Sequence, residues 1–377
     1  MRKRVFVVGM FDSVHFGRWL EQFAEESLDI YLFPSTWHRR VHPIIKGLMM
    51  GQGACRYMAS PRLMTVLPVP LTLADRILRT RIRARILSRA LRHVQPHLIH
   101  AVELQHAGYL VLDSLQMNDD TQTRLLVTNY GSDIFWYRQF PEHMSRLRQL
   151  LPRANFYSCE CTRDVGLATE MGFQGNVLPV IPNAGGQTVP ERLSPPSSRK
   201  IIAIKGYTGF VGRAELALEA ISKLSHLLKD YEIVFVKSSI RLWLMARRTR
   251  NSTGIRITCW VRKRPHHKIL DLLEKSRIYV GISMSDGIST TLLEAMSRGA
   301  FPIQTDTSCA GEWITPSCGM TLPPDINELC EALKRAVTDD ALVDSAVVVN
   351  QQTIRSRADK LHIRNLRRYW YTDLSAD

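Results

Sequence analysis

The sequence has no apolar run long enough to cross a membrane. A transmembrane helix needs about 18 or more consecutive apolar residues, whereas the apolar stretch Val5–Met10 is soon interrupted by Asp12. The same interruption argues against a signal peptide, although Arg2, Lys3 and Arg4 precede the stretch. We therefore expect no membrane span and a cytoplasmic location.

Patterns that would indicate disulfides or a bound metal are also scarce. The seven cysteines include no CxxC pair, and their number is odd, which favours free thiols in a reducing compartment. The Cys159-x-Cys161 pattern, the His97-x-x-His100 pattern and the pair His266-His267 are weak metal signals. We expect no metal and no disulfide framework.

The charge of the chain, by contrast, is strongly unbalanced. The 377 residues carry a formal net charge of +15, with ordinary proportions of hydrophobic (45%) and charged (23%) residues. The length predicts two domains, and the charge favours an acidic partner such as nucleic acid, an anionic membrane or a phosphate-bearing substrate. No zinc-finger or RNA-recognition motif occurs, and the basic residues are not interleaved with base-stacking aromatics, so we expect no nucleic-acid partner.

Short apolar strands alternate with helices in both halves of the chain. Such alternation predicts an α/β protein with parallel sheets covered on both faces, here two doubly wound Rossmann-like domains. A segment rich in proline and serine separates the two alternations. The expected divisions are an N-terminal domain over 1–185, a linker over 186–199, a C-terminal domain over 200–350 and a terminal helix over 351–377.

The most informative segment follows an expected strand that ends at Ser283. A polar turn containing Gly287 opens a helix, whose free N–H groups would form a phosphate cradle. Two acids, Asp286 and Glu294, flank the start of that helix. Two structural readings stay open: Thr291-x-x-Glu294 matches a capping box, and Asp286 suits an Asx-turn.

This segment resembles the donor-site signature of the retaining GT-B glycosyltransferases of family four, the glycogen-synthase-like type. That signature has two acids with seven residues between them, in the form Glu-Gly-Phe-Gly-x-x-x-x-Glu-Ala-Met, followed by Gly and then an apolar residue before Pro. Glu294-Ala295-Met296, Gly299 and Pro302 fit the signature, whereas Asp286 and Ser289 depart from it.

The resemblance implies a GT-B fold, in which two Rossmann-like domains face a central cleft and a C-terminal helix crosses back to the N-terminal domain. It implies that Glu294 holds the ribose and that Asp286 meets the donor sugar near the reacting carbon. Lys205 and Arg213 would neutralise the diphosphate, unless they are solvated surface cations. The implied donor-binding residues are Lys205, Arg213, Gly287, Ile288, Ser289, Thr290 and Glu294.

The N-terminal half offers acceptor-side candidates. Tyr130-Gly131-Ser132-Asp133 resembles the family's Gly-Ser-Asp turn, and His15 follows the first expected strand. The resemblance thus proposes Asp286, Asp133 and His15 as catalytic, although Asp133 and His15 equally suit turns.

The implied activity is retaining transfer of a hexose from a nucleotide-diphosphate sugar, most simply a UDP-sugar, without cofactor or metal. The absence of Asp-x-Asp disfavours the metal-dependent single-domain design. The acceptor would be a glycan or a polyprenyl or other lipid-linked sugar of bacterial polysaccharide or glycolipid synthesis. The alternatives are an epimerase or hydrolase on the same fold, and a non-enzymatic nucleic-acid- or membrane-binding protein.

A basic amphipathic segment predicts peripheral attachment to an anionic membrane. Residues 76–92 contain no acid, and their apolar positions recur at helical spacing. The alternative is a helix that packs on the core and exposes a basic back. The basic residues are Arg76, Arg79, Arg81, Arg83, Arg85, Arg89 and Arg92.

Overall fold

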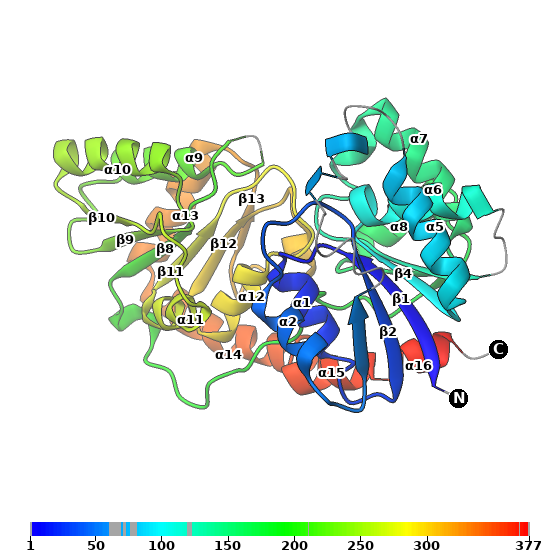
Figure 1. The fold of residues 1–377 in the computed structure, drawn as a ribbon. Helices are drawn as coiled ribbons and strands as arrows, with labels where there is room; N and C mark the ends of the chain where they lie inside the picture. The colour runs from blue at the N-terminus through cyan, green and yellow to red at the C-terminus, as the bar shows by residue number, and fades with distance from the viewer. Residues whose placement is uncertain are drawn as a thin grey trace. The chain divides into compact units, whose positions relative to one another are not determined.

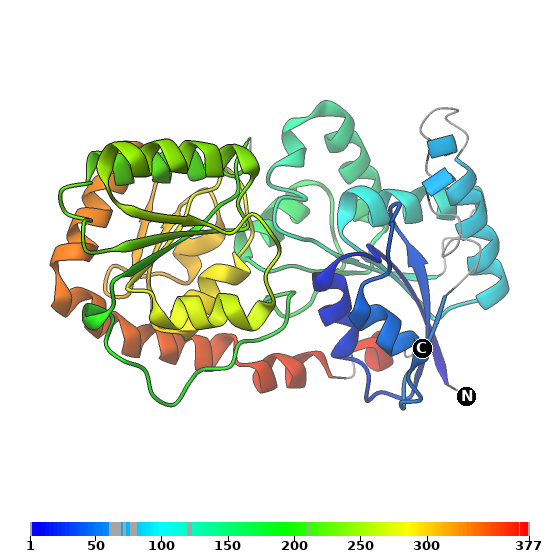
Figure 2. The same ribbon diagram turned by 60° about the vertical axis from the view of Figure 1, so that its left-hand side comes forward.

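The computed structural model divides the chain into two compact units. Unit 1 comprises Met1–Gly185 with Ile363–Asp377, and unit 2 comprises Gly186–His362. The structure describes residues 2–59, 69–70, 73–75, 81–118, 123–209, 211–368 and 370–375. Each unit is a parallel β-sheet with helices on both faces (Figures 1 and 2).

Unit 1 is built on a seven-stranded sheet with the order β3-β2-β1-β4-β5-β6-β7. Its strands are β1 (Lys3–Gly9), β2 (Leu28–Pro34), β3 (Arg56–Ala59), β4 (Leu98–Val102), β5 (Arg124–Thr128), β6 (Phe156–Ser158) and β7 (Asn176–Val177). Its helices are α1 (Val14–Glu21), α2 (Pro43–Met50), α5 (Ile82–Val94), α6 (Tyr109–Asn118), α7 (Pro141–Leu150), α8 (Thr162–Glu170) and α16 (Trp370–Leu374), with the end of α15 (Lys360–Arg367).

The sequence of β1 explains why this sheet is covered on both faces. Val5 and Val7 belong to one hydrophobic cluster, and Phe6 and Val8 belong to another. Because successive side chains of a strand point to opposite faces, a continuous apolar run needs helices on each side. Helices α5, α6 and α7 pack in the cluster of Phe6 and Val8, and helices α1 and α16 pack in the cluster of Val5 and Val7.

Unit 2 is built on a six-stranded sheet with the order β10-β9-β8-β11-β12-β13. Its strands are β8 (Ile201–Lys205), β9 (Glu232–Val236), β10 (Arg256–Cys259), β11 (Ile278–Gly281), β12 (Phe301–Thr305) and β13 (Met320–Leu322). Its helices are α9 (Ala214–Lys223), α10 (Ile240–Thr253), α11 (His266–Lys275), α12 (Thr290–Ser297), α13 (Ile326–Thr338) and α14 (Asp340–Arg357). The strand order reverses between β8 and β11, and ligands of open α/β sheets bind outside the carboxyl ends of strands at such a point.

The segment expected as a linker, 186–199, is part of unit 2. Ser197 donates from its backbone N–H and its hydroxyl to Asp344 of α14, at 2.9 and 2.6 Å. The guanidinium of Arg199 donates to the carbonyl oxygens of Ser276 and Arg298. These bonds hold the segment against unit 2, so the prediction of a linker is corrected.

The end of the chain returns to the N-terminal unit, but not as the single helix expected over 351–377. α14 ends at Arg357, and two shorter helices, α15 and α16, follow. Arg367 is fully buried in unit 1, where it donates to the carbonyl oxygens of Pro182 and Asn183 and lies 4.2 Å from the centre of the Trp19 ring. The guanidinium of Arg367 therefore holds residues 363–377 against Pro182 and Asn183, near the end of the first part of unit 1.

The structure also bears on the expectations about cysteines and membrane spans. All seven cysteines are free. Among the described residues, no helix combines the length and the apolar character that a bilayer span requires.

Candidate donor site in unit 2

The candidate site is built around an ion pair at the point where the strand order of unit 2 reverses. Lys205 is the last residue of β8, and Asp286 lies in the loop that joins β11 to α12. The Nζ atom of Lys205 lies 2.9 Å from Oδ2 of Asp286 and 3.5 Å from Oγ of Ser289. The structure thus brings together three residues that were separate candidates in the sequence.

The environment keeps Lys205 charged. Burial alone would lower the pKa of Lys205, but the carboxylate of Asp286, helped by Tyr279 and Tyr207, outweighs burial and raises that pKa above its usual value. Tyr279 is itself fully buried, and burial raises the pKa of its hydroxyl to about 12 despite the opposing charge of Lys205. The site therefore presents a permanent cation.

The turn after Asp286 leads into the open start of a helix. Oδ1 of Asp286 accepts from the N–H of Gly287 at 3.1 Å, and Ile288 and Ser289 are buried. Ser289 is the N-cap of α12, but its side chain makes no capping hydrogen bond, and the helix begins at Thr290. The first N–H groups of a helix have no partner within the helix, so this end can bind an anion.

Arg213 is placed beside the same loop by backbone pairing. Gly212 forms an isolated antiparallel bridge with Ser283, and the N–H of Arg213 donates to the carbonyl oxygen of Ile282 at 3.2 Å. A side chain at 212 would clash, because its Cβ would lie 2.5 Å from the carbonyl oxygen of Tyr207. The guanidinium of Arg213 forms no ion pair or hydrogen bond with the described residues, and so is available to a ligand.

Glu294 lies inside α12 and does not form the capping box that the sequence allowed. The helix starts one residue before Thr291, so Thr291 is not its N-cap. Glu294 is 4% exposed, and its Oε1 lies 2.6 Å from Nε2 of His266, the first residue of α11. The sequence analysis missed His266 as a site residue, because only the packing of α11 on α12 brings it to Glu294.

The acceptor-side candidates belong to unit 1. Oδ2 of Asp133 accepts from the N–H groups of Leu104 and Tyr130, at 2.9 and 3.0 Å, so this residue does shape a turn. Burial raises the pKa of Asp133 above its usual value. Burial, together with the charge of Asp133, raises the pKa of the neighbouring Glu103. His15 is half-buried in the first turn of α1.

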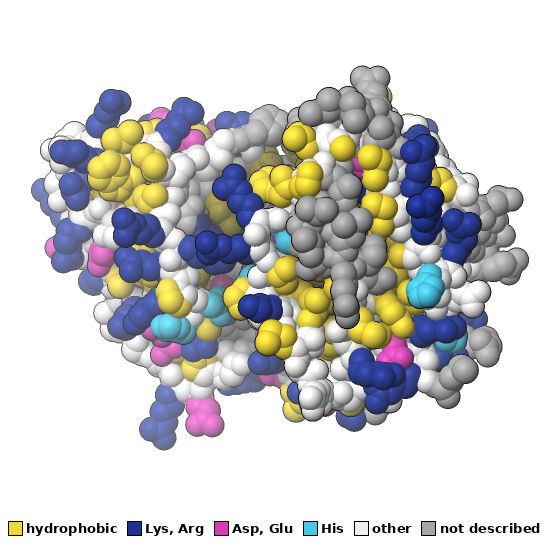
Figure 3. Space-filling view, viewed as in Figure 1, with side chains coloured by type: hydrophobic (Ala, Val, Ile, Leu, Met, Phe, Trp, Pro, Cys, Tyr) yellow, Lys and Arg dark blue, Asp and Glu magenta, His cyan; other side chains and the backbone are white. Residues whose placement is uncertain are grey.

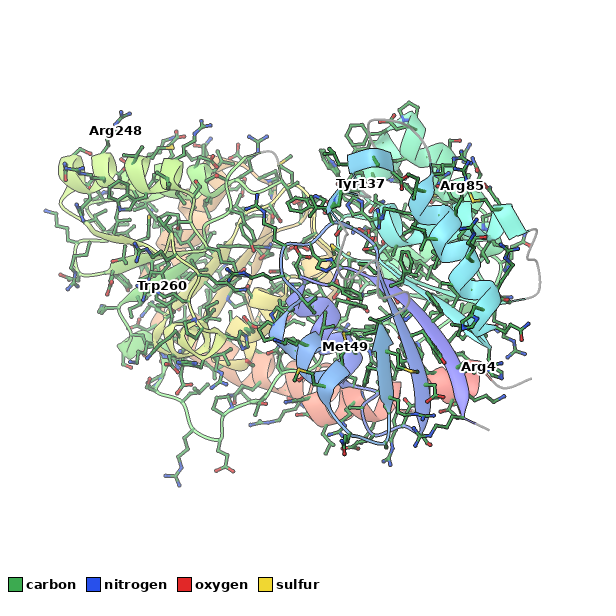
Figure 4. All side chains as sticks on the ribbon, in the orientation of Figure 1. Arg4, Met49, Arg85, Tyr137, Arg248 and Trp260 are labelled. Atoms are coloured by element: carbon green, nitrogen blue, oxygen red, sulfur yellow. The ribbon has the colours of Figure 1, made fainter. Side chains whose placement is uncertain are left out.

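Within the basic segment 76–92, the apolar side of α5 packs on the core of unit 1, as the alternative interpretation expected. Attachment to a membrane through this segment stays a prediction. Within α5, Leu87 and Leu91 are buried in the core of unit 1. Arg83 is 8% exposed and donates to the carbonyl oxygen of Pro34 at 2.8 Å. The helix therefore packs on the core with an exposed basic back, on which Arg85 is labelled in Figure 4. Arg76 and Arg79 lie outside the described residues.

The segment that contains the candidate site matches a protein-family model. Residues 202–339 match the family model described as "Glycosyl transferases group 1". No curated protein matches the chain.

The chain is also similar to solved structures over almost its whole length. One is HepE from Anabaena in complex with UDP-glucose (11% identity, 96% of this chain and 97% of that chain covered, TM-score 0.66). A second is a sucrose-phosphate synthase from Thermosynechococcus elongatus (13% identity, 99% of each chain, TM-score 0.68). A third is a UDP-forming α,α-trehalose-phosphate synthase from Burkholderia xenovorans (11% identity, 99% of each chain, TM-score 0.68). The likeness confirms the expected GT-B fold, in which the segment that matches glycosyltransferases group 1 contains the site around Lys205 and Asp286.

Proposed function

We propose that this protein is a retaining glycosyltransferase that transfers a hexose from a UDP-sugar to a glycan or lipid-linked acceptor in bacterial polysaccharide or glycolipid assembly. The observation that carries the proposal is the Lys205–Asp286 pair beside the open N-terminus of α12. A neighbour of the same fold was solved with UDP-glucose, and the family match covers this segment.

The cations and the start of α12 suit the diphosphate of such a donor. Lys205 and Arg213 would bind its oxygens, together with the N–H groups in the first turn of α12. Charge develops on the leaving diphosphate as the glycosidic bond breaks, and preorganised cations stabilise that charge. A diphosphate that draws Lys205 away from Asp286 would also free Oδ2 of Asp286 to accept a hydrogen bond from a hydroxyl of the sugar.

Glu294 would hold the nucleoside end of the donor. A carboxylate accepts two hydrogen bonds from adjacent ribose hydroxyls, and such charge-assisted bonds are stronger than neutral ones. Nε2 of His266 lies 2.6 Å from Oε1 of Glu294, and this contact would orient the carboxylate.

Asp133 is the acceptor-side base in this proposal. Burial raises the pKa of this carboxyl group, which makes Asp133 a stronger base than a solvent-exposed carboxylate. Its Oδ1 accepts no hydrogen bond from the described residues, since both backbone N–H groups that it binds use Oδ2. His15, in the first turn of α1, is a second acceptor-side candidate.

The test starts from a panel of sugar nucleotides screened by thermal shift, followed by transfer to candidate acceptors and NMR of the anomeric centre. We expect a UDP-sugar to stabilise the protein and the product to keep the donor's anomeric configuration. Inversion would contradict the retaining mechanism. Conversion of the donor without any acceptor would instead indicate an epimerase or a hydrolase.

A further inference from the structure

The outer face of α10 combines exposed apolar side chains with arginines. Ile240, Trp243 and Leu244 are 67%, 42% and 49% exposed, whereas Leu242 and Ala246 on the same helix are buried. Residues three and four apart share one face of a helix, so the three exposed side chains adjoin one another. Their exposure to water is unfavourable, and they do not contribute to the core of unit 2.

The same face is strongly basic and unpaired. The sequence of α10 contains no acid. Its arginines are exposed, and they form no ion pair with the described residues: Arg241, Arg247, Arg248 and Arg250. Figure 3 shows the hydrophobic side chains over α10 with Lys and Arg side chains around them, and Figure 4 shows Arg248 pointing away from the helix.

A neighbouring loop extends the basic surface. The N–H of Ser238, just before α10, donates to the carbonyl oxygen of Trp260 at 3.0 Å, so the loop that follows β10 starts beside the helix. That loop exposes Val261, Arg262, Lys263 and Arg264. The loop therefore adds one apolar and three cationic side chains near the start of α10.

We propose that the outer face of α10 docks on an anionic lipid bilayer. Helices that lie in the membrane interface bury Trp and aliphatic residues among the acyl chains and hold Lys and Arg at the headgroups. Arginine stems lie along apolar surface while the charged ends reach the phosphates. Helix α10 contains no acid, so the charge of this face complements a negatively charged lipid surface.

This docking surface lies close to the candidate donor site within unit 2. The hydroxyl of Thr208, in the loop after β8, lies 3.1 Å from the hydroxyl of Ser239, the N-cap of α10. Lys205 is three residues before Thr208. Docking through α10 would therefore hold the C-terminal edge of this sheet near the headgroups, whatever reaction takes place there.

The experiment is co-sedimentation with vesicles of phosphatidylcholine, with and without phosphatidylglycerol. We expect the wild type to bind only the anionic vesicles, and less at high salt. Leu244→Glu and the double change Arg247→Glu/Arg248→Glu should each weaken binding by about tenfold or more. Brominated lipid should quench tryptophan fluorescence of the wild type more than that of Trp243→Phe.

Two control variants separate this face from general adsorption. Val348→Glu alters an apolar residue of α14 that is 69% exposed, and Arg85→Glu/Arg89→Glu alters the basic back of α5. Both should bind anionic vesicles within about twofold of the wild type. All variants should bind UDP as the wild type does, which separates a failure of docking from a failure of the proposed activity.

Three results would overturn the proposal. Equal loss in the α5 variant would indicate unspecific attraction by the net charge. Binding that is unaffected by Leu244→Glu would exclude insertion of this face. Self-association that Leu244→Glu abolishes, without vesicle binding, would show that a second copy of the chain covers α10.

Discussion

The ion pair between Lys205 and Asp286 makes the charges of the candidate site interdependent. Asp286→Asn keeps an acceptor for the N–H of Gly287 but removes the charge that faces Nζ of Lys205 at 2.9 Å. Because Asp286 is proposed to act at the sugar, we expect kcat to fall by about tenfold or more, a barrier increase of about 1.4 kcal/mol, with KM changed little. Steady-state kinetics with the identified donor measure both constants.

A double-mutant cycle with Lys205→Met tests the pair itself. Residues in contact couple by about 0.5–3 kcal/mol, so the double variant should lose less activity than the two single losses combined. Asp271→Asn, an exposed acid on α11, is the control and should be neutral. A rise in KM with kcat unchanged would assign Asp286 to binding alone.

Glu294 offers a second test at the level of one residue. Glu294→Gln should weaken UDP binding by about tenfold, since charged acceptors form bonds roughly twice as strong as neutral ones. Calorimetric titration with UDP measures the affinity, and a thermal melt shows that the variant is folded. His266→Ala should reduce the affinity less, because it removes only the partner that orients Oε1. If the folded Glu294→Gln variant bound UDP as tightly as the wild type, the role of this carboxylate would be structural, limited to its contact with His266 between α12 and α11.

At the scale of elements, the segment that returns to unit 1 is held by a buried polar network. In the core, Nδ1 of His100 lies 2.6 Å from the hydroxyl of Tyr371 in α16, and Nε2 lies 2.7 Å from the hydroxyl of Thr128 in β5. Trp19 donates to the same Tyr371 hydroxyl at 3.1 Å. Both ring nitrogens of His100 are thus engaged, and the imidazole links β4 to α16 in its neutral form.

This network predicts a loss of stability in acid. Burial, and then the charge of Arg367, lower the pKa of His100 to about 3 in the folded protein, against about 6.5 in an unfolded chain. Between these values the unfolded chain binds a proton that the native state does not, so stability falls as pH falls, by at most about 1.4 kcal/mol per pH unit. Above pH 6.5 the contribution is complete.

Urea unfolding at pH 7 and at pH 4.5 measures this dependence. His100→Gln should be less stable than the wild type at pH 7, and the gap should shrink by up to about 2.7 kcal/mol at pH 4.5, two pH units below the unfolded-state pKa. Other titrating groups cancel in the comparison of the two proteins. A gap that does not change with pH would show that His100 takes up its proton in the folded state as well.

The elements show where prediction from sequence succeeded and where it did not. The β-branched runs predicted the central strands, because strands buried on both faces need continuous apolar sequence. The sequence of α10 does not predict a surface helix clearly, since its exposed Ile240, Trp243 and Leu244 obscure the one-sided pattern of such a helix. The single terminal helix was wrong because the breaks after Arg357 and Arg367 carry neither Gly nor Pro.

The candidate site divides in the same way between local and tertiary information. The turn at Gly287 and the start of α12 follow from neighbouring residues, so the sequence could predict them. The partner of Asp286 is 81 residues away in the chain, and that of Glu294 is 28 residues away. The order of the strands and the packing of the helices bring these residues together, and one sequence alone reveals neither. The burial of Arg83 likewise depends on a carbonyl oxygen 49 residues away.

At the scale of the whole molecule, each unit has its own hydrophobic clusters on the two faces of its own sheet. Unit 2 is inserted within unit 1, because the chain enters it at Gly186 and leaves it at His362. The proposed donor residues Lys205, Arg213, Asp286 and Glu294 all belong to unit 2. A ligand that binds the native state stabilises the part that must be folded to bind it.

We therefore expect UDP to protect unit 2 selectively. At a concentration of about 100 times Kd the stabilisation should be about 2.7 kcal/mol, and hydrogen exchange should slow most in peptides from β8, β11 and α12. Peptides from β1 and β4 of unit 1 should exchange at nearly unchanged rates, because an opening of unit 1 alone leaves the nucleotide site folded. The Glu294→Gln variant at the same UDP concentration is the control, and its protection should be smaller. Equal protection of both units would show that they unfold as one cooperative body, whereas protection confined to unit 1 would place the nucleotide outside the site around Lys205 and Asp286.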